Sequence, residues 1–99
     1  MIDKWLSGIA TSIKSIDLNA ATYQDAARLT YRLNAYIDQL ALYDGGQLGF
    51  TVVRSSAITD RALSVAIPKG SMSAAQRAAI DAAKVRAQAF DVTLEVFEF

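Results

Sequence analysis

Three polar residues near the start of the chain, Asp3, Ser12 and Lys14, have side chains suited to phosphate chemistry. A carboxylate and a hydroxyl offer oxygen ligands to a divalent metal such as Mg²⁺, Mn²⁺ or Zn²⁺, with water and phosphate oxygens completing its shell. A lysine ammonium can orient or deprotonate an attacking water, or stabilise charge that develops on a phosphate. These residue types predict metal-assisted hydrolysis if the fold brings them together.

A β-hairpin would bring the three residues together. Two β-prone runs flank Ser7-Gly8, and a two-residue loop of this kind joins antiparallel strands. In that register Asp3 lies opposite Ser12, with Cβ atoms about 5 Å apart, and Lys14 is a diagonal neighbour at about 7–8 Å. A three-residue loop would shift the parity and separate Asp3 from the other two. The strands are predicted over residues 2–6 and 9–18, and the shared face carries Asp3, Trp5, Ala10, Ser12, Lys14 and Ile16.

A solvated polar stripe with a cross-strand ion pair is the alternative interpretation of the same three residues, because such stripes cover most exposed sheet faces. Trp5 and Ile16 on the same face favour partial cover, and partly buried polar groups require an explanation. Asp17 is a further candidate metal ligand. Strand alternation puts it on the opposite face unless the strand twists or bulges.

Composition limits the other kinds of chemistry. The 99 residues are 53% hydrophobic and 20% charged, which predicts one folded domain over residues 1–99. The chain has no histidine and no cysteine, which excludes histidine triads, Cys/His nucleophiles and thiolate or histidine zinc sites. The formal net charge is zero, so a nucleic-acid partner would need cations gathered on one face. No apolar run approaches the roughly 20 residues of a membrane span, and no signal-peptide pattern is visible in these 99 residues.

Helical periodicity follows the hairpin. The apolar spacing from Ala26 to Tyr43 predicts a helix that is capped by Asn19 or by Thr22, the latter in a capping box with Asp25. A turn at residues 44–46, Asp-Gly-Gly, ends this helix.

The second half of the chain repeats the alternation of strands and helices. Ser73 and Gln76 form a capping box that begins a second helix, over residues 74–90. Strands are predicted over residues 48–54, 61–68 and 92–99. The order β-β-α-β-β-α-β predicts an α/β fold of mixed α+β character, with a single mixed β-sheet and helices packed on it.

Possible substrate contacts lie on the first helix. Gln24, Arg28 and Arg32 follow one another at i, i+4 and i+8 and could track a phosphate backbone, although such a row is more often a helix's solvent face. Tyr23 and Tyr31 could stack on bases, although tyrosines at the edge of a core are common.

The hairpin also carries a family resemblance. The C-terminal nuclease toxin domains of CdiA-type contact-dependent growth inhibition proteins, in the PD-(D/E)xK nuclease superfamily, place an Asp before a hairpin and a Ser-x-Lys-x-x-Asp run after it. This chain resembles them in Ile2-Asp3-Lys4-Trp5 and in the run from Gly8 to Leu18. Asp3 matches the motif Asp, Ser12 the position usually held by Glu or Asp, Lys14 the motif lysine and Asp17 the trailing Asp. Further similarity covers Tyr23-Gln24, Tyr36-Ile37-Asp38, residues 66–70 and Gln76-Arg77.

The resemblance implies a restriction-endonuclease-like core and a metal-dependent endonuclease toxin that cleaves DNA or tRNA. It implies catalytic roles for Asp3, Ser12 and Lys14, and a Mg²⁺, Mn²⁺ or Zn²⁺ site at Asp3, Ser12 and Asp17. It also implies a cognate immunity protein, and delivery as the C-terminal part of a larger secreted or surface protein into the cytoplasm of a target bacterium. The family usually adds a metal-binding Glu from an N-terminal helical part, which we expect to precede residue 1.

A non-catalytic protein-binding module, such as an immunity-like or adaptor domain, is the alternative function. It predicts that Asp3, Ser12 and Lys14 are splayed apart or exposed to water, with neither a metal nor a phosphate held between them.

Overall fold

The computed structural model describes residues 2–6, 8–43, 45–48, 51–70 and 72–98. None of the helices in these ranges is long and apolar enough to span a membrane. The strands are β1 (Lys4–Leu6), β2 (Ile9–Ser15), β3 (Gly45–Leu48), β4 (Thr51–Arg54), β5 (Asp60–Ile67) and β6 (Val92–Glu98). The helices are α1 (Ala21–Gln24), α2 (Ala26–Ala41) and α3 (Ala74–Ala89), with a 3₁₀ turn at Ser55–Ala57.

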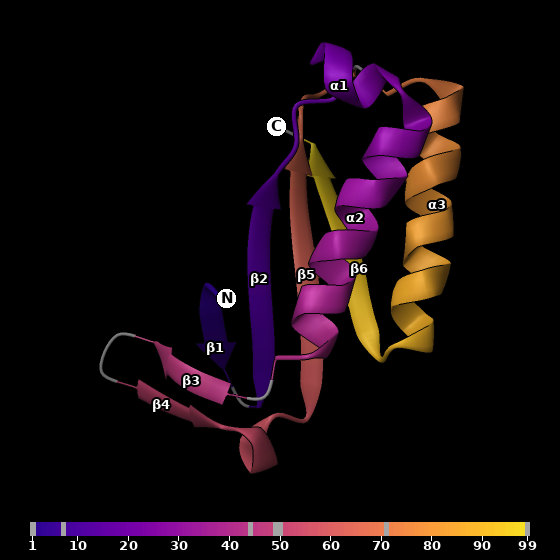
Figure 1. Cartoon of the computed structure of the whole chain (residues 1–99). Coiled ribbons are helices and arrows are strands. Elements are labelled where there is room, and N and C mark those ends of the chain that lie inside the picture. Colours follow the sequence, from indigo (N-terminus) through magenta and orange to yellow (C-terminus); the bar gives the residue numbers. More distant parts are fainter. Residues whose placement is uncertain (1, 7, 44, 49–50, 71, 99) are drawn as a thin grey trace.

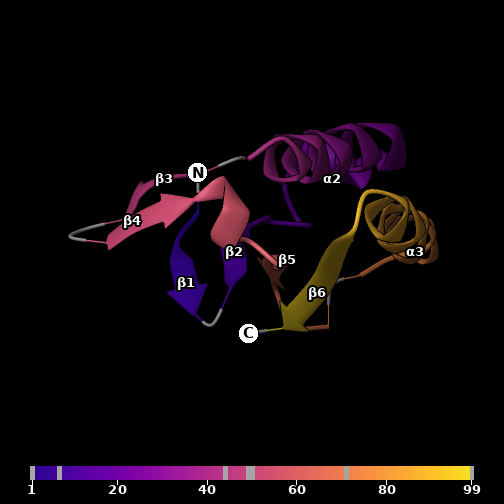
Figure 2. The same ribbon diagram turned by 90° about the horizontal axis from the view of Figure 1, so that it is seen from below.

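A four-stranded mixed sheet forms the centre of the fold, which confirms the predicted fold class. Its order is β1-β2-β5-β6, with β1 antiparallel to β2 and the other two pairs parallel. Helices α2 and α3 lie side by side on one face of this sheet (Figures 1 and 2). The core lies between the helices and that face, because residues on alternate positions of β2, β5 and β6 are buried there.

The register of the β1–β2 hairpin agrees with the prediction. Lys4 pairs with Thr11, Trp5 with Ala10 and Leu6 with Ile9. At the turn, Gly8 adopts φ +85°, and a Cβ there would lie 2.5 Å from the Thr59 hydroxyl oxygen. Glycine is therefore favoured at this position by both its positive φ and the close approach of Thr59. Ser7, the other predicted turn residue, lies outside the described residues.

The first helical segment differs from the prediction of one helix capped at Asn19 or Thr22. It divides at Asp25, which has extended backbone (φ −82°, ψ 111°) between α1 and α2. The Asp25 carboxylate accepts a hydrogen bond from the Ala27 N–H at 2.9 Å and so caps α2 itself. The predicted capping box between Thr22 and Asp25 was wrong. The Asp25 carboxylate caps α2, which begins after it, and does not take part in a capping box with Thr22.

The segment predicted as one sheet strand over residues 48–54 also differs. Here β3 and β4 pair with each other as a separate antiparallel ribbon, which projects beside β1 in Figures 1 and 2. Gly45 and Gly46, which were predicted to end the helix in a turn, begin β3, and Asp44 lies outside the described residues. Local pairing of two neighbouring short strands replaced insertion of one strand into the sheet.

One buried amide joins the start of α3 to the segment after β2. Gln76 is fully buried and forms the predicted capping box, in which its Oε1 accepts from the Ser73 N–H and the Ser73 hydroxyl accepts from the Gln76 N–H. Its Nε2 donates to the carbonyl oxygens of Leu18, at 2.9 Å, and Tyr23, at 2.8 Å. This side chain therefore fixes α1 against the carboxyl end of β2.

We expect Gln76→Ala to lower the free energy of unfolding by about 2–4 kcal/mol, because the buried Gln76 side chain is truncated and the partly buried Tyr23 carbonyl and Ser73 N–H lose their partner. Urea denaturation followed by circular dichroism measures this change. Gln88→Ala, at an exposed position of the same helix, is the matched control and should change stability by no more than about 0.5 kcal/mol. Equal midpoints for the two variants would contradict the role given to the Gln76 amide.

Candidate functional site

Ser12 lies on the helix-covered face of β2, between the buried residues Ala10 and Ile16 in the alternation of that strand. Its side chain is 1% exposed, and its hydroxyl oxygen has no hydrogen-bond partner within the described part of the chain. A buried hydroxyl without a partner is costly, so its presence points to a ligand or a water at this position. The solvated-stripe interpretation was wrong for Ser12.

Asp3 lies beside Ser12, at a bend that immediately precedes β1. Its N–H donates to the Thr11 carbonyl at 2.7 Å, and its Oδ2 accepts from the Ile13 N–H at 2.8 Å. The two bonds hold the Asp3 backbone and carboxylate against the residues on either side of Ser12. The carboxylate is exposed to solvent and therefore open to a ligand.

Lys14 is half-buried on the same face as Ser12 and points toward α2. Its Nζ lies 5.4 Å from the centroid of the Tyr36 ring, and the Arg32 guanidinium carbon lies 5.9 Å from the same centroid. Both distances are within the range of cation–π attraction. Within the described residues neither cation forms an ion pair, so both charges remain available to an anion.

Tyr36 is the residue of this site that sequence reasoning missed. The sequence placed it within the apolar spacing of the helix and within a segment of family similarity, without a role in the site, and it does pack against the core. Its spacing from Arg32, four residues along α2, was the available signal, because such residues are neighbours on a helix surface. The sequence contained no signal that Lys14 would reach the same ring from a different element.

Asp17 does not join Asp3 and Ser12. It follows the end of β2, five residues after Ser12, which corresponds to roughly 16 Å of extended chain. Its Oδ1 accepts a hydrogen bond from the Asn19 N–H at 3.0 Å, so the carboxylate forms part of the turn that leads to α1.

The oxygen donors at Asp3 and Ser12 fit a hard divalent cation. One carboxylate and one unpartnered hydroxyl are donors of the kind that Mg²⁺ and Mn²⁺ prefer. The described residues contain no group of three or more His, Cys, Asp or Glu side chains that could hold a metal. A metal here would therefore be held by two protein ligands, with the other ligand positions left to water and phosphate.

The predicted row of Gln24, Arg28 and Arg32 is divided by the break at Asp25. Gln24 is on α1, and its Nε2 donates to the Leu18 carbonyl at 2.9 Å. Arg28 and Arg32 remain four residues apart on α2 and line the same surface hollow, to which Gln24 does not contribute. Arg28 has one weak ion pair, 3.8 Å from Asp25, and both side chains are largely exposed.

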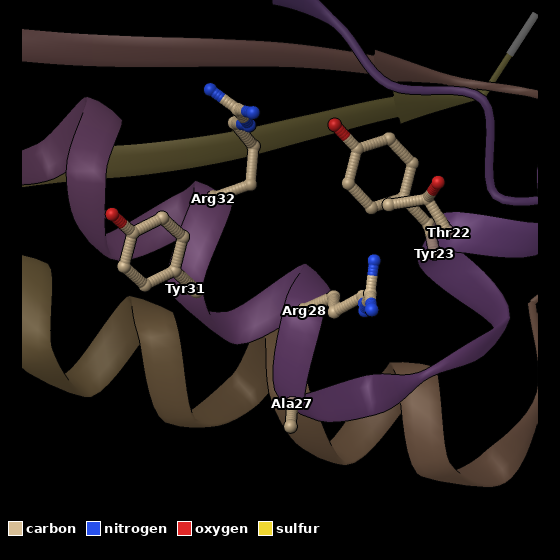
Figure 3. A pocket seen from close by; sticks show the side chains of 6 residues that line it. All are labelled: Thr22, Tyr23, Ala27, Arg28, Tyr31 and Arg32. Carbon is tan, nitrogen blue, oxygen red and sulfur yellow. The ribbon is translucent and has the colours of Figure 1, made fainter.

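This hollow has a volume of about 320 Å³ and lies over α1 and the first turns of α2. Figure 3 shows the rings of Tyr23 and Tyr31 on opposite sides of it, with the side chains of Arg28 and Arg32 between them. Tyr31 is 74% exposed, whereas Tyr23 is half-buried and packs against the core. The surface is aromatic and cationic, a combination that suits nucleic acid.

Comparisons with known proteins agree with the fold and place the chain in a family. The solved structure of a CdiA-CT/CdiI toxin and immunity complex from Yersinia pseudotuberculosis contains a similar chain, with a TM-score of 0.74 and 24% sequence identity. The match covers 94% of this chain and 75% of that one, and at this identity it supports the shared fold. Comparison with curated proteins gave no similar sequence. The family model described as the CDI toxin restriction endonuclease-like domain matches residues 1–97, and the chain therefore belongs to this family of toxin domains.

Proposed function

We propose that this toxin domain is a metal-dependent endonuclease that hydrolyses phosphodiester bonds of DNA or tRNA. The observation that carries the proposal is the buried, unpartnered Ser12 hydroxyl, with the Asp3 carboxylate held on the N–H of the next residue, Ile13, and Lys14 on the same strand face as Ser12. A carboxylate, a hydroxyl and an ammonium are groups that can take part in metal-assisted phosphate hydrolysis. Membership of a restriction endonuclease-like family supports the same activity.

Asp3 and Ser12 would hold the divalent cation, and that cation would supply Lewis-acid stabilisation of the charge on the scissile phosphate. Lys14 would place its ammonium against a phosphate oxygen and stabilise the negative charge that grows as water attacks and the ester oxygen leaves. The Tyr36 ring limits the positions open to the ammonium and so reduces the entropy that is lost when the phosphate binds.

Arg28 and Arg32 would bind the phosphates that flank the cleaved bond. Guanidinium groups pair with phosphate oxygens through two parallel hydrogen bonds, and Arg32 shares the Tyr36 ring with Lys14. The nucleic-acid strand would therefore run from the hollow on α2 toward Lys14. Gln24 would act indirectly, since its amide hydrogen-bonds to the Leu18 carbonyl.

Family membership supports two inferences about the biological setting. The Yersinia relative was crystallised as a toxin and immunity complex, and we infer that a cognate immunity protein neutralises this domain as well. We also infer that the domain is delivered as the C-terminal part of a larger secreted or surface protein and acts in the cytoplasm of a target bacterium.

A non-catalytic binding module remains the second candidate function. The observation that favours it is the sheet face opposite the helices, where Ile13 is 51% exposed and Phe97 is 53% exposed. The Lys14→Ala variant separates the two functions. A binding module would show no nucleic-acid cleavage that depends on Lys14, whereas a nuclease would.

Lys14→Ala should lower the rate of nucleic-acid cleavage by about 10²–10³-fold, because charge on the transition state loses its ammonium partner. The assay incubates the purified chain with plasmid DNA and with total tRNA in Mg²⁺, Mn²⁺ or Zn²⁺, and EDTA should abolish cleavage. Lys84→Ala, at an exposed position of α3, is the matched control and should cleave at the wild-type rate. Equal cleavage by wild type and Lys14→Ala would refute the role of Lys14.

Ser12→Ala should separate stability from activity. Removing a buried hydroxyl that has no protein partner should leave the free energy of unfolding unchanged or raise it by up to about 1 kcal/mol. Metal-dependent cleavage should fall by about tenfold or more, because a metal ligand is lost. Ser15→Ala, at an exposed position of β2, serves as control for both measurements. Loss of stability with full retention of activity would show that Ser12 is structural.

If Arg28 and Arg32 contact phosphates, their substitution should reduce the salt dependence of DNA binding. Arg28→Gln and Arg32→Gln should each weaken binding to duplex DNA, measured in EDTA, and each should reduce the slope of log K against log salt by about 0.9. Arg77→Gln, at an exposed position of α3, should leave the slope unchanged. Equal slopes for the wild type and the three variants would show that Arg28 and Arg32 do not contact the phosphates.

A further inference from the structure

The hollow over α1 and α2 has one feature that phosphate binding does not explain, namely two tyrosine rings that lie on opposite sides of it (Figure 3). Phosphates need only cations and N–H donors, whereas flat aromatic rings suit a flat apolar ligand. Its volume of about 320 Å³ is within the range of small-molecule sites. Its lining consists of Thr22, Tyr23, Ala27, Arg28, Tyr31 and Arg32, and includes no carboxylate.

Tyr31 is the more informative of the two rings. It is 74% exposed, so the core does not account for it. A single exposed tyrosine is ordinary on a protein surface. Tyr31 differs because it stands at the edge of a hollow in which Arg28 lies one turn earlier on α2 and Arg32 lies next to it. An exposed ring beside two guanidinium groups can stack on a base while these neighbours bind phosphates.

The opposite wall is fixed before any ligand arrives. The Tyr23 ring packs against the core, and the Tyr23 carbonyl accepts a hydrogen bond from the buried Gln76 amide at 2.8 Å. Gln76 and Gln24 also both donate to the Leu18 carbonyl, which holds α1 in place. Little conformational entropy of the protein is therefore lost on the Tyr23 side of the hollow when a ligand binds.

The two arginines of the hollow, Arg28 and Arg32, are available to bind phosphate. Asp25 is the nearest carboxylate to Arg28, at 3.8 Å, and an exposed pair of this length is weak enough to exchange for a phosphate. Arg32 forms no ion pair within the described residues and shares the Tyr36 ring with Lys14. A nucleotide in the hollow would thus lie next to the proposed site of cleavage.

We propose that this hollow binds one nucleobase that has left its stack, with the base against the Tyr31 ring and the adjacent phosphates on Arg28 and Arg32. The inference rests on the proposed nuclease function and deepens it, because it names the kind of substrate that binds best. A base must be unpaired to enter, so single strands and locally opened duplexes are favoured over intact duplex. Stacking accepts every base, so the pocket selects for an unpaired base and not for a sequence.

The test measures binding of a fluorescently labelled single-stranded oligodeoxynucleotide to the full chain in EDTA, where no cleavage occurs. Tyr31→Ala should weaken binding by about 5- to 100-fold, and Tyr31→Phe should stay within about threefold of wild type. Phe90→Ala removes an exposed aromatic ring at the other end of the helical layer and should leave binding unchanged. Wild-type affinity in Tyr31→Ala would overturn the inference.

A ligand without bases provides a second test. An oligomer of abasic deoxyribose phosphates, of equal length and charge, should bind the wild-type chain no more tightly than the intact oligonucleotide binds Tyr31→Ala. Equal binding of the abasic and intact oligomers to the wild type would overturn the inference. Cleavage is assayed separately with metal, so cleavage that depends on Lys14 but not on Tyr31 would refute only the base pocket. Binding that depends on Tyr31, without cleavage in any metal, would refute only the nuclease function.

Discussion

The rest of the structure depends on the register in which β2 pairs with β1 and β5. Side chains alternate along a strand, so the register that buries Ala10 and Ile16 also places Ser12 and Lys14 beneath α2. A slip of one residue would turn all four to the open face and bring Ile13 into the core. The core and the candidate site therefore share one constraint, and a change that displaced the site residues would also disrupt the packing that folds the domain.

The buried Gln76 amide has a comparable role at the other end of the sheet. Helix α1 is a single turn with no buried residue of its own, and so short a helix is not stable by itself. Hydrogen bonds from Gln76 to the Leu18 and Tyr23 carbonyls hold this turn where β2 leads into the helical layer. Because Tyr23 forms a wall of the hollow, one side chain on α3 sets the shape of a surface that it does not itself line.

The features that could be predicted from the sequence are those set by local chemistry. The hairpin register follows from a two-residue loop with glycine at φ +85°, and the start of α3 follows from the capping pair of Ser73 and Gln76. The errors arose where two local solutions compete. Asp25 can close one capping box or start another helix, and the described residues of the segment 48–54, which are Leu48 and residues 51–54, can enter a sheet or pair within a ribbon. Contacts between distant elements, such as that of Lys14 with Tyr36, have no local signal at all.

The net charge of the chain does not describe how its charges are distributed over the surface. A net charge of zero suggests no affinity for a polyanion, and the ten acidic residues balance the ten basic ones. The fold nevertheless brings Lys14 and Arg32 to one ring and Arg28 to the adjoining hollow, where the lining residues include no carboxylate. Screening limits charge effects to about 10 Å at 0.1 M salt, so a phosphate at this surface interacts with the local cations and hardly with distant acidic groups. The local arrangement of charges, and not their sum, therefore determines whether this face can bind a nucleic acid.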